Sequence, residues 1–460
     1  MLFAQGIGAR PKAVPTETTS LQPKSSGGTE VSVPTCRAYG VLALLALLKV
    51  LCSCDKHLLS AFANFIIPEL ELTVSQFGAL LGIGYVLSYS IMDLIAGPLV
   101  DICPSRPLLL TAGIFVWSLL TGVCGGVHGF AGLLLTRIFV GVGESVLGPV
   151  AISYVAELFP PAHRGFPDGC FASGGNLGGA LALIFAGALG ETLGWRWIFG
   201  LLGMFGMVVG LTVPLFLKEG NERRAITVRE AATGLQLNLR LGLRVVTGCV
   251  SLRCLLPGTM VMTIPGTVIG LMQPFLTEER GASRSEAALV SGYVMLAAGV
   301  IGNPLVGWLA DVVCRRFGYS QISFAGCVTL VVMLPAGLGF LLSKQDASPA
   351  FWTAYAFYII GSSIQGVWFS IVQDLSPPHL RGTIIGLMIC VLSLFDGVWK
   401  LLAGLSVDYL KDNEAPRPYA TALVIFTVMQ VLVQSVSFFL TGYTLKEGVR
   451  WIDTVASEFR

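Results

Sequence analysis

The chain has 460 residues, of which 54% are hydrophobic and only 12% are charged, and its mean hydropathy is +0.76. Soluble domains carry about 25% charged residues, so this composition excludes a soluble protein and predicts one that crosses a membrane many times. The 29 Lys and Arg nearly balance the 27 Asp and Glu, so the net charge indicates no class of partner.

The first 38 residues are rich in Ser, Thr, Pro and Gly and contain no long apolar run. This composition is typical of a disordered tail and not of a cleaved signal peptide. We therefore expect residues 1–38 to be a disordered cytosolic tail.

Long apolar runs then predict an all-α membrane protein with twelve transmembrane helices in two six-helix halves. The expected N-terminal half is 39–217, followed by a cytosolic linker at 218–247, the C-terminal half at 248–442 and a cytosolic tail at 443–460. From about residue 232 the leucines of the linker sit among arginines, which fits either a helix on the inner membrane surface or a solvated linker. The expected spans are 39–67, 75–100, 107–128, 130–157, 165–190, 196–217, 248–276, 286–310, 321–342, 350–373, 382–409 and 417–442.

The distribution of basic residues predicts the orientation. If both termini are cytoplasmic, the inner loops and tails hold eighteen Lys and Arg and the outer loops hold six. The positive-inside rule therefore favours a multi-pass protein with both termini in the cytoplasm. Which membrane holds it does not follow from these residues.

Two markers occur twice in the same order. Gly97-Pro-Leu-Val-Asp101 returns as Gly307-Trp-Leu-Ala-Asp311, and the segment 157–165 returns as 374–382. The offsets are 210 and 217 residues, close to half of the chain, which indicates a duplicated membrane half.

The repeated loops are interpreted as latches that hold one conformation. Their glycines allow close helix crossing, Asp101 or Asp311 can accept hydrogen bonds from a neighbouring helix N-terminus, and a following arginine can pair with an acid across the interface. Asp93, just before the first loop, is expected to cap or tether that loop. The expected latch residues are Asp93, Gly97, Asp101, Arg106, Gly307, Asp311, Arg315 and Arg316.

Charged residues inside the spans indicate a cavity, because an ionisable side chain at mid-bilayer costs about 3 kcal/mol on insertion scales. Asp396 and Lys400, four residues apart, form either a self-neutralising structural pair or a pair that opens when substrate or a proton competes. The expected substrate and proton site consists of Asp55, Lys56, Arg137, Glu144, Asp396 and Lys400, and Lys49 is a further charge in the first span.

Enzyme signatures are missing from the sequence. It has no Walker loop, zinc-ligand spacing or Gly-x-Ser-x-Gly elbow. We therefore expect a protein that is not an enzyme, needs no cofactor or metal, binds no nucleic acid and is a monomer in the lipid bilayer.

The duplicated loops resemble those of the major facilitator superfamily, although Ile102 stands where an arginine is usual. Within that superfamily, Asp55-Lys56 and the run from Arg137 to Glu144 are most similar to the spinster-like lipid transporters, with the related organic-anion symporters next. The resemblance implies that Arg137 and Glu144 are the central charged pair and that Glu144 carries the proton. Lys56 replaces the usual arginine, so a single ammonium charge stands where a guanidinium would offer two parallel hydrogen bonds to a carboxylate or phosphate.

These features together predict a secondary active transporter that works by alternating access and is driven by protons. Its expected substrate is anionic or amphipathic, of the lysolipid or sphingoid type, with an apolar wall beside the charges. The alternatives are an organic-anion or sugar symporter and, in another class, a nutrient sensor that moves nothing. The aromatic candidates for the wall are Phe62, Phe65, Trp352, Tyr355, Tyr358, Trp368 and Trp399.

Overall fold

The structure is a computed structural model that describes residues 36–72, 74–218, 228–281, 292–317, 320–343 and 349–458. Within these ranges the regular structure is entirely helical. Twelve helices are long and apolar enough to cross a membrane, which confirms the predicted all-α fold. The expected tail at 1–38 lies outside the described residues apart from its last three.

The described part of the N-terminal half contains eight α-helices. The second span includes a π-helical segment at Leu80–Leu87, and the long helix α8 covers the fifth and sixth spans, turning at Gly194, where φ is +73°. Glycine adopts this φ without steric cost. The helices are α1 (Cys36–Ala61), α2 (Ala63–Glu69), α3 (Val74–Ala79), α4 (Ser88–Ile102), α5 (Arg106–Cys124), α6 (Phe130–Glu144), α7 (Leu147–Leu158) and α8 (Gly165–Phe216).

The C-terminal half repeats this arrangement with three further π-helical segments, at Phe275–Glu279, Met295–Gly299 and Thr329–Met333. Its α-helices are α10 (Val250–Val261), α11 (Ile264–Pro274), α13 (Val300–Phe317), α14 (Gln321–Val328), α15 (Leu334–Leu342), α16 (Pro349–Ser362), α17 (Gln365–Asp374), α18 (Arg381–Asp412) and α19 (Pro418–Glu458).

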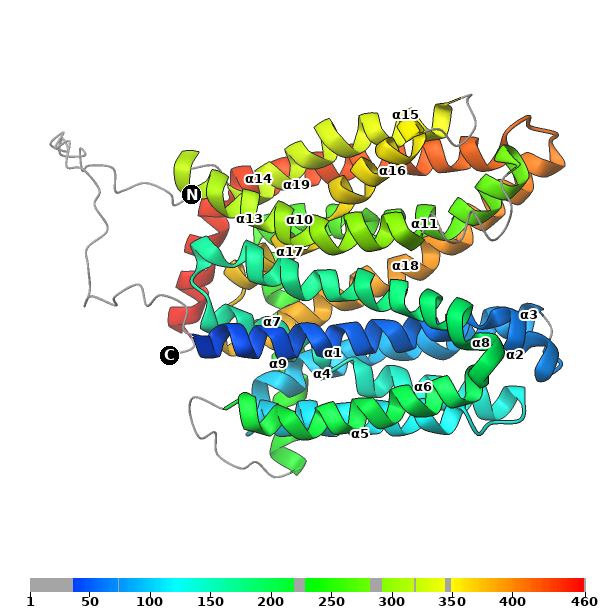
Figure 1. The fold of residues 1–460 in the computed structure, drawn as a ribbon. Coiled ribbons are helices and arrows are strands. Elements are labelled where there is room, and N and C mark those ends of the chain that lie inside the picture. The colour runs from blue at the N-terminus through cyan, green and yellow to red at the C-terminus, as the bar shows by residue number, and fades with distance from the viewer. Residues whose placement is uncertain are drawn as a thin grey trace, which may run out of the picture.

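The two halves lie side by side as two bundles (Figure 1). Helix α1 packs along α8 in the first half, and α10 packs along α19 in the second. Across the boundary, α4 contacts α18 and α8 contacts α13 and α17. Helix α1 begins and α19 ends at the same end of the bundle, here called the terminal face, and the opposite end is called the far face (Figure 1).

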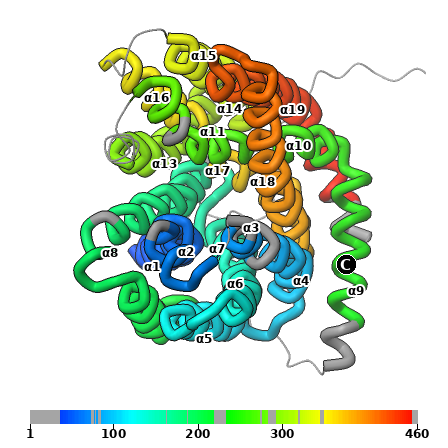
Figure 2. The backbone as a smooth tube through the Cα atoms, turned by 90° about the vertical axis from the view of Figure 1, so that its right-hand side faces the viewer, coloured from blue at the N-terminus to red at the C-terminus, as the bar shows by residue number. Residues whose placement is uncertain are grey.

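The segment between the halves contains the helix α9 (Val228–Gly248). It contacts both α4 and α18 and runs along one side of the bundle (Figure 2). Its exposed positions include Leu237, Arg240, Leu243 and Arg244, so apolar and basic side chains share its outer face. The segment expected as a tail from residue 443 is a continuation of α19 up to Glu458.

The halves meet most closely at glycines of the repeated motifs. A methyl group on Gly97 would lie 2.6 Å from the carbonyl oxygen of Gly382, and one on Gly307 would collide with the carbonyl oxygen of Gly165. Small residues are what allow helices to approach this closely in a membrane.

Contacts between the halves and the candidate transport site

Two aspartates of the repeated loops bind helix N-termini in the opposite half. Asp101 accepts hydrogen bonds from the backbone amides of Gly382 (2.8 Å) and Thr383 (2.6 Å) at the start of α18. Asp311 accepts hydrogen bonds from the amides of Gly165 and Phe166, both 3.1 Å, at the start of α8. The first amides of a helix have no partner within the helix, and its N-terminus favours a negative charge.

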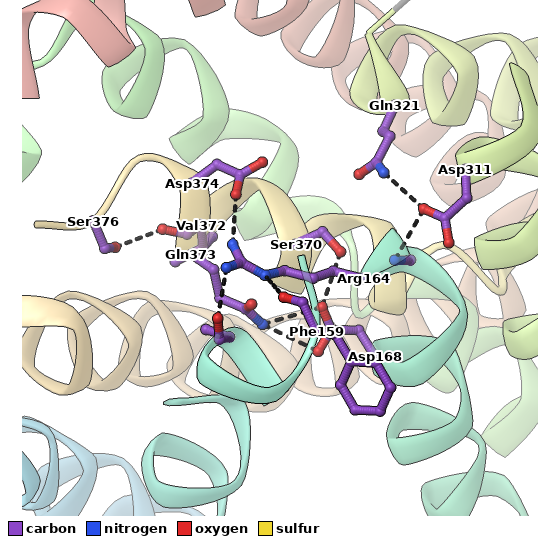
Figure 3. Close-up of polar contacts among 12 residues, drawn as sticks. Phe159, Arg164, Asp168, Asp311, Gln321, Ser370, Val372, Gln373, Asp374 and Ser376 are labelled. Atoms are coloured by element: carbon purple, nitrogen blue, oxygen red, sulfur yellow. Dashed lines mark hydrogen bonds and ion pairs between the residues drawn. The ribbon is translucent and has the colours of Figure 1, made fainter. Parts of the chain in front are cut away.

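These contacts follow the duplication. The aspartate of the first Gly-x-Leu-x-Asp motif binds the glycine that ends the second copy of the other motif, and the reverse holds for Asp311. Asp311 is held in turn by the side-chain amide of Gln321, which donates at 2.7 Å (Figure 3).

A third group of contacts joins the halves through residues that were not among the predicted latch or site residues. Arg164 donates to the carboxylate of Asp374 at 2.8 Å and to the backbone oxygens of Phe159 and Ala156 (Figure 3).

Asp168, also missed, is fully buried at this boundary. It accepts hydrogen bonds from Ser370 (2.9 Å) and Gln373 (3.0 Å) of α17. Asp168 lies one turn after Gly165 in the repeated motif, so its position in an apolar helix was the available signal.

The arginines after the repeated loops were expected to form ion pairs with acids of the opposite half. Their observed contacts are different. Arg106 pairs with Glu157 of its own half, at 2.7 and 2.9 Å. Arg315 donates to the backbone oxygen of Asp311. Burial lowers the pKa of His163 in the loop before α8, and the positive charge of Arg315 lowers it further. Arg316 lies over the ring of Phe317 and forms no hydrogen bond or ion pair with the other half among the described residues.

Asp93 does not cap or tether the loop. Its side chain is fully buried, and neither carboxylate oxygen has a hydrogen-bond donor within the described ranges. Asp93 is instead buried in the bundle, where Lys49 and Lys56 of α1 act on its carboxyl group electrostatically.

Among the described residues, the hydrogen bonds between the halves lie between the terminal face and the middle of the bundle, where Asn176 donates to the backbone oxygen of Gly299. At the far face the described hydrogen bonds stay within one half. Glu69, for example, accepts from Trp195 and Arg196, and these two donors lower its pKa. The structure therefore shows the terminal face closed.

The buried centre of the N-terminal half is a chain of four polar side chains. Arg137 donates to Asp55 at 3.4 Å, and the hydroxyl of Tyr85 donates to Glu144. The carboxyl groups of Asp55 and Glu144 interact electrostatically with each other. All four side chains are buried, and the guanidinium of Arg137 also stacks on the ring of Phe199.

This arrangement corrects the expected pairing of Arg137 with Glu144. The partner of Arg137 is Asp55, and the partner of Glu144 is Tyr85. Tyr85 was not predicted, because no charge or repeated motif marks it in the sequence. It comes from the π-helical segment Leu80–Leu87, which approaches α6 at Gly141, and π-helical turns are frequent at functional sites.

Two lysines of α1 face the same interior. Lys56 lies 5.6 Å above the ring of Tyr85, and Lys49, seven residues earlier on the same helix face, lies 5.8 Å from the ring of Phe171. Among the described residues neither lysine forms an ion pair within 4.0 Å. Lys49 was noted in the sequence but not placed in the expected site.

The C-terminal half contributes the expected pair on α18. Lys400 donates to Asp396 at 2.7 Å, and the lysine side chain is 51% exposed whereas the aspartate is 14% exposed. Asp396 also interacts electrostatically with Lys56, so charges of both halves meet in the middle of the protein.

The expected aromatic wall is mostly part of the packed core. Phe62, Tyr355, Tyr358 and Trp368 are fully buried, and Phe340 packs edge-on against both tyrosines. These rings hold helices together and do not line an open surface.

Twelve spans in two duplicated halves, with charges gathered between them and one face closed, define a membrane transport protein. The family model of the Major Facilitator Superfamily matches residues 45–398. The chain therefore belongs to this superfamily and is a transporter that binds small-molecule substrates, and the expectation that it is not an enzyme is confirmed.

The chain is 26% identical to an MFS-type efflux pump of Mycolicibacterium smegmatis, over 90% of this chain and 94% of the relative. It is 24% identical to a hexuronate transporter of Bacillus subtilis, over 85% and 93%. Among solved structures, it is similar to a bacterial homologue of the human lysosomal transporter Spinster in an inward-facing, unoccupied conformation. That match has a TM-score of 0.62 and 22% identity, and covers 90% of this chain and 98% of that chain.

Proposed function

We propose that the protein couples proton movement to the transport of a small organic anion by alternating access. The observation that carries the proposal is the pair Lys49 and Lys56, two lysines near mid-membrane without an ion-pair partner among the described residues. At 1.5 Å per residue, Lys49 lies about 20 Å from the start of α1. A cation at this depth without an ion pair is costly, and an anionic substrate would reduce the cost.

Lys400 supplies a third cation from the opposite half. Its side chain is half exposed and shares Asp396 with Lys56. An anion bound between Lys56 and Lys400 would draw the two halves together, because it compensates charges on both. Substrate binding would in this way favour one arrangement of the halves over the other.

The proton is assigned to Glu144 and Asp55. Each carboxyl group keeps one buried oxygen with no hydrogen-bond donor in the described part of the chain, and the two groups approach each other. Two adjacent carboxyl groups share one proton at much lower cost than two negative charges. Arg137 compensates one charge, so loss of the shared proton would leave a second charge uncompensated and drive a rearrangement.

The contacts at the terminal face are the proposed latch. Release of Asp101 from α18 and of Asp311 from α8 would open this face. The excess of Lys and Arg in the loops on this side supports a cytoplasmic location for it and for both termini.

A small anion is favoured over a lysolipid because four of the seven aromatic side chains proposed for an apolar wall are fully buried in packing contacts. The similarity to a hexuronate transporter supports the same choice. Hexuronates and related sugar acids combine a carboxylate with hydroxyl groups, so they are the substrates to test first.

The test is uptake into proteoliposomes with an imposed pH gradient. Labelled glucuronate is expected to accumulate when the gradient is present, and unlabelled sugar acids are expected to compete. Binding without flux would identify a sensor. Flux of a lysolipid that sugar acids do not inhibit would replace the proposed substrate class.

A further inference from the structure

A groove lies on the outer surface of the C-terminal half, between α10 and α19, well away from the charged centre. It has a volume of about 610 Å³. Pro257 of α10 and Leu432, Val436 and Leu440 of α19 line it, and all four are exposed. Sites for a single small molecule typically have about 300–1,000 Å³.

The groove faces hydrocarbon. Its lining residues belong to the spans Val250–Met272 and Pro418–Ile452, and the exposed fractions of Leu432, Val436 and Leu440 are 52%, 57% and 49%. The surroundings of such a surface in a membrane are lipid acyl chains. A concave apolar surface at this depth therefore accommodates an acyl chain.

One cation stands at the end of the groove nearer the terminal face. Arg253 is exposed and is the fourth residue of its span, about 5 Å from the start of α10. Its guanidinium forms no hydrogen bond or ion pair with the described residues. Arg253 is the only charged residue in Val250–Pro257, the first turns of the span.

The height of Arg253 relative to α19 is fixed by two contacts. Ser251 donates to the backbone oxygen of Thr444 at 2.8 Å, and Ser437 donates to the backbone oxygen of Cys254. Arg253 therefore lies between the levels of Ser437 and Thr444, beside the end of the groove that Leu440 forms. Tyr443, 89% exposed, marks the same level with an aromatic ring, as is common at the membrane interface.

We propose that this groove binds an anionic phospholipid, with the phosphate on Arg253 and one acyl chain against Pro257, Val436 and Leu440. A guanidinium binds a phosphate with two parallel hydrogen bonds and keeps its charge at any physiological pH. The head group lies where phosphates lie in the leaflet at the terminal face. A lipid with a net negative charge is preferred because a zwitterionic head group brings its own cation close to Arg253.

The lipid would bridge α10 and α19, whose serines already link them. These two helices also contact α18, which carries Asp396 and Lys400. A lipid in the groove would therefore stabilise the packing around the C-terminal part of the transport site without touching the substrate.

The experiment is native mass spectrometry of the full chain, delipidated in detergent and then titrated with phosphatidylglycerol or phosphatidylcholine of equal chain length. Wild type is expected to retain phosphatidylglycerol about fivefold more tightly, the gain typical of one basic residue at an anionic membrane surface. Arg253→Ala is expected to lose this preference, and Arg253→Lys to keep part of it. Val436→Trp, which fills the groove, is expected to weaken binding of both lipids.

Matched controls separate the groove from general attraction to a basic surface. Arg240→Ala removes an exposed arginine of α9, and Val331→Trp enlarges an exposed apolar residue away from the groove. Both are expected to bind as wild type does. Equal retention of the two lipids by wild type, or an unchanged preference in Arg253→Ala, would overturn the proposal.

Discussion

Asp101 accepts hydrogen bonds from both the backbone amide and the hydroxyl of Thr383, each at 2.6 Å, although the two residues are 282 positions apart and belong to opposite halves. The carboxylate caps α18 at the point where Gly97 and Gly382 bring the helices together. A local change at Asp101 should therefore alter how the two halves separate.

The first prediction concerns this contact. Asp101→Asn removes the charge and one acceptor, and hydrogen bonds to charged groups contribute about 1.5–3 kcal/mol. The closed terminal face should lose population by about tenfold, which 1.4 kcal/mol produces. Hydrogen exchange of the Gly382 and Thr383 amides, followed by mass spectrometry, is expected to be faster in the variant. Arg316→Ala serves as the control and should exchange at the wild-type rate, because Arg316 contacts Phe317 and not the other half.

The second prediction concerns the shared proton. Glu144→Gln keeps a side chain that can donate to Asp55 but cannot release a proton, so pH-driven uptake should fall to the uncoupled level while exchange of substrate continues. Tyr85→Phe, which removes only the hydrogen bond to Glu144, should retain driven uptake at a reduced rate. Driven uptake at the wild-type level in Glu144→Gln would contradict the assignment of the transported proton to Glu144.

The third prediction concerns the lysines. Lys56→Ala should raise the KM for the anion at least tenfold, since Lys56 has no ion pair among the described residues and is available for substrate. Lys56→Arg preserves the charge and should recover most of the affinity. Equal KM values in wild type and Lys56→Ala would mean that the anion binds elsewhere.

The fourth prediction concerns the pair on α18. Lys400→Ala leaves Asp396 without its ion pair, but Lys56 still interacts with that carboxylate and Lys400 is half exposed. The loss of stability should therefore stay below about 1 kcal/mol, as for other solvent-accessible pairs. The Asp396→Ala, Lys400→Ala double variant should unfold at a temperature equal to or above that of Lys400→Ala. A double variant clearly less stable than the single one would contradict this.

The fifth prediction concerns pH at the far face. The indole of Trp195 and the guanidinium of Arg196 lower the pKa of Glu69 below its ordinary 4.5, so its contribution to stability is present above pH 4.5 and is lost as the pH falls through the lower value in the folded protein. Thermal unfolding should therefore separate wild type from Glu69→Gln at pH 6, and the difference should shrink on acidification. A difference in unfolding temperature that stays constant down to pH 3 would show that the ionised carboxylate of Glu69 does not stabilise the protein.

Hydropathy predicted the number of spans because a bilayer imposes a length on every apolar segment, and the repeats predicted that Asp101 and Asp311 would accept hydrogen bonds from a helix N-terminus. The partners within the bundle could not be predicted in the same way. The period of a single helix places Arg137 and Glu144 on one face, yet Asp55 from α1 and Tyr85 from the π-helical segment are their partners. Such contacts depend on how α1, α4 and α6 cross, which no spacing within one helix encodes.

Two interfacial residues of the repeated motif and its following helix were missed for related reasons. Asp168 was overlooked because its copy in the second half is the apolar Ile385, and Arg164 because its interfacial partner is an acid of the other half. The groove beside Arg253 was also unpredictable, since exposed and buried apolar residues of a membrane span look alike in a sequence.

The exchange of aspartates between the halves has a consequence for how the chain assembles. A single half made alone would carry an uncapped helix and a carboxylate with no amide to bind, at the same face of the membrane. Each half holds what the other lacks. If the chain is divided within residues 219–227 and the two fragments are translated separately, they should still bind each other, because each aspartate caps a helix of the other half. The covalent connection would then mainly keep the two halves close together.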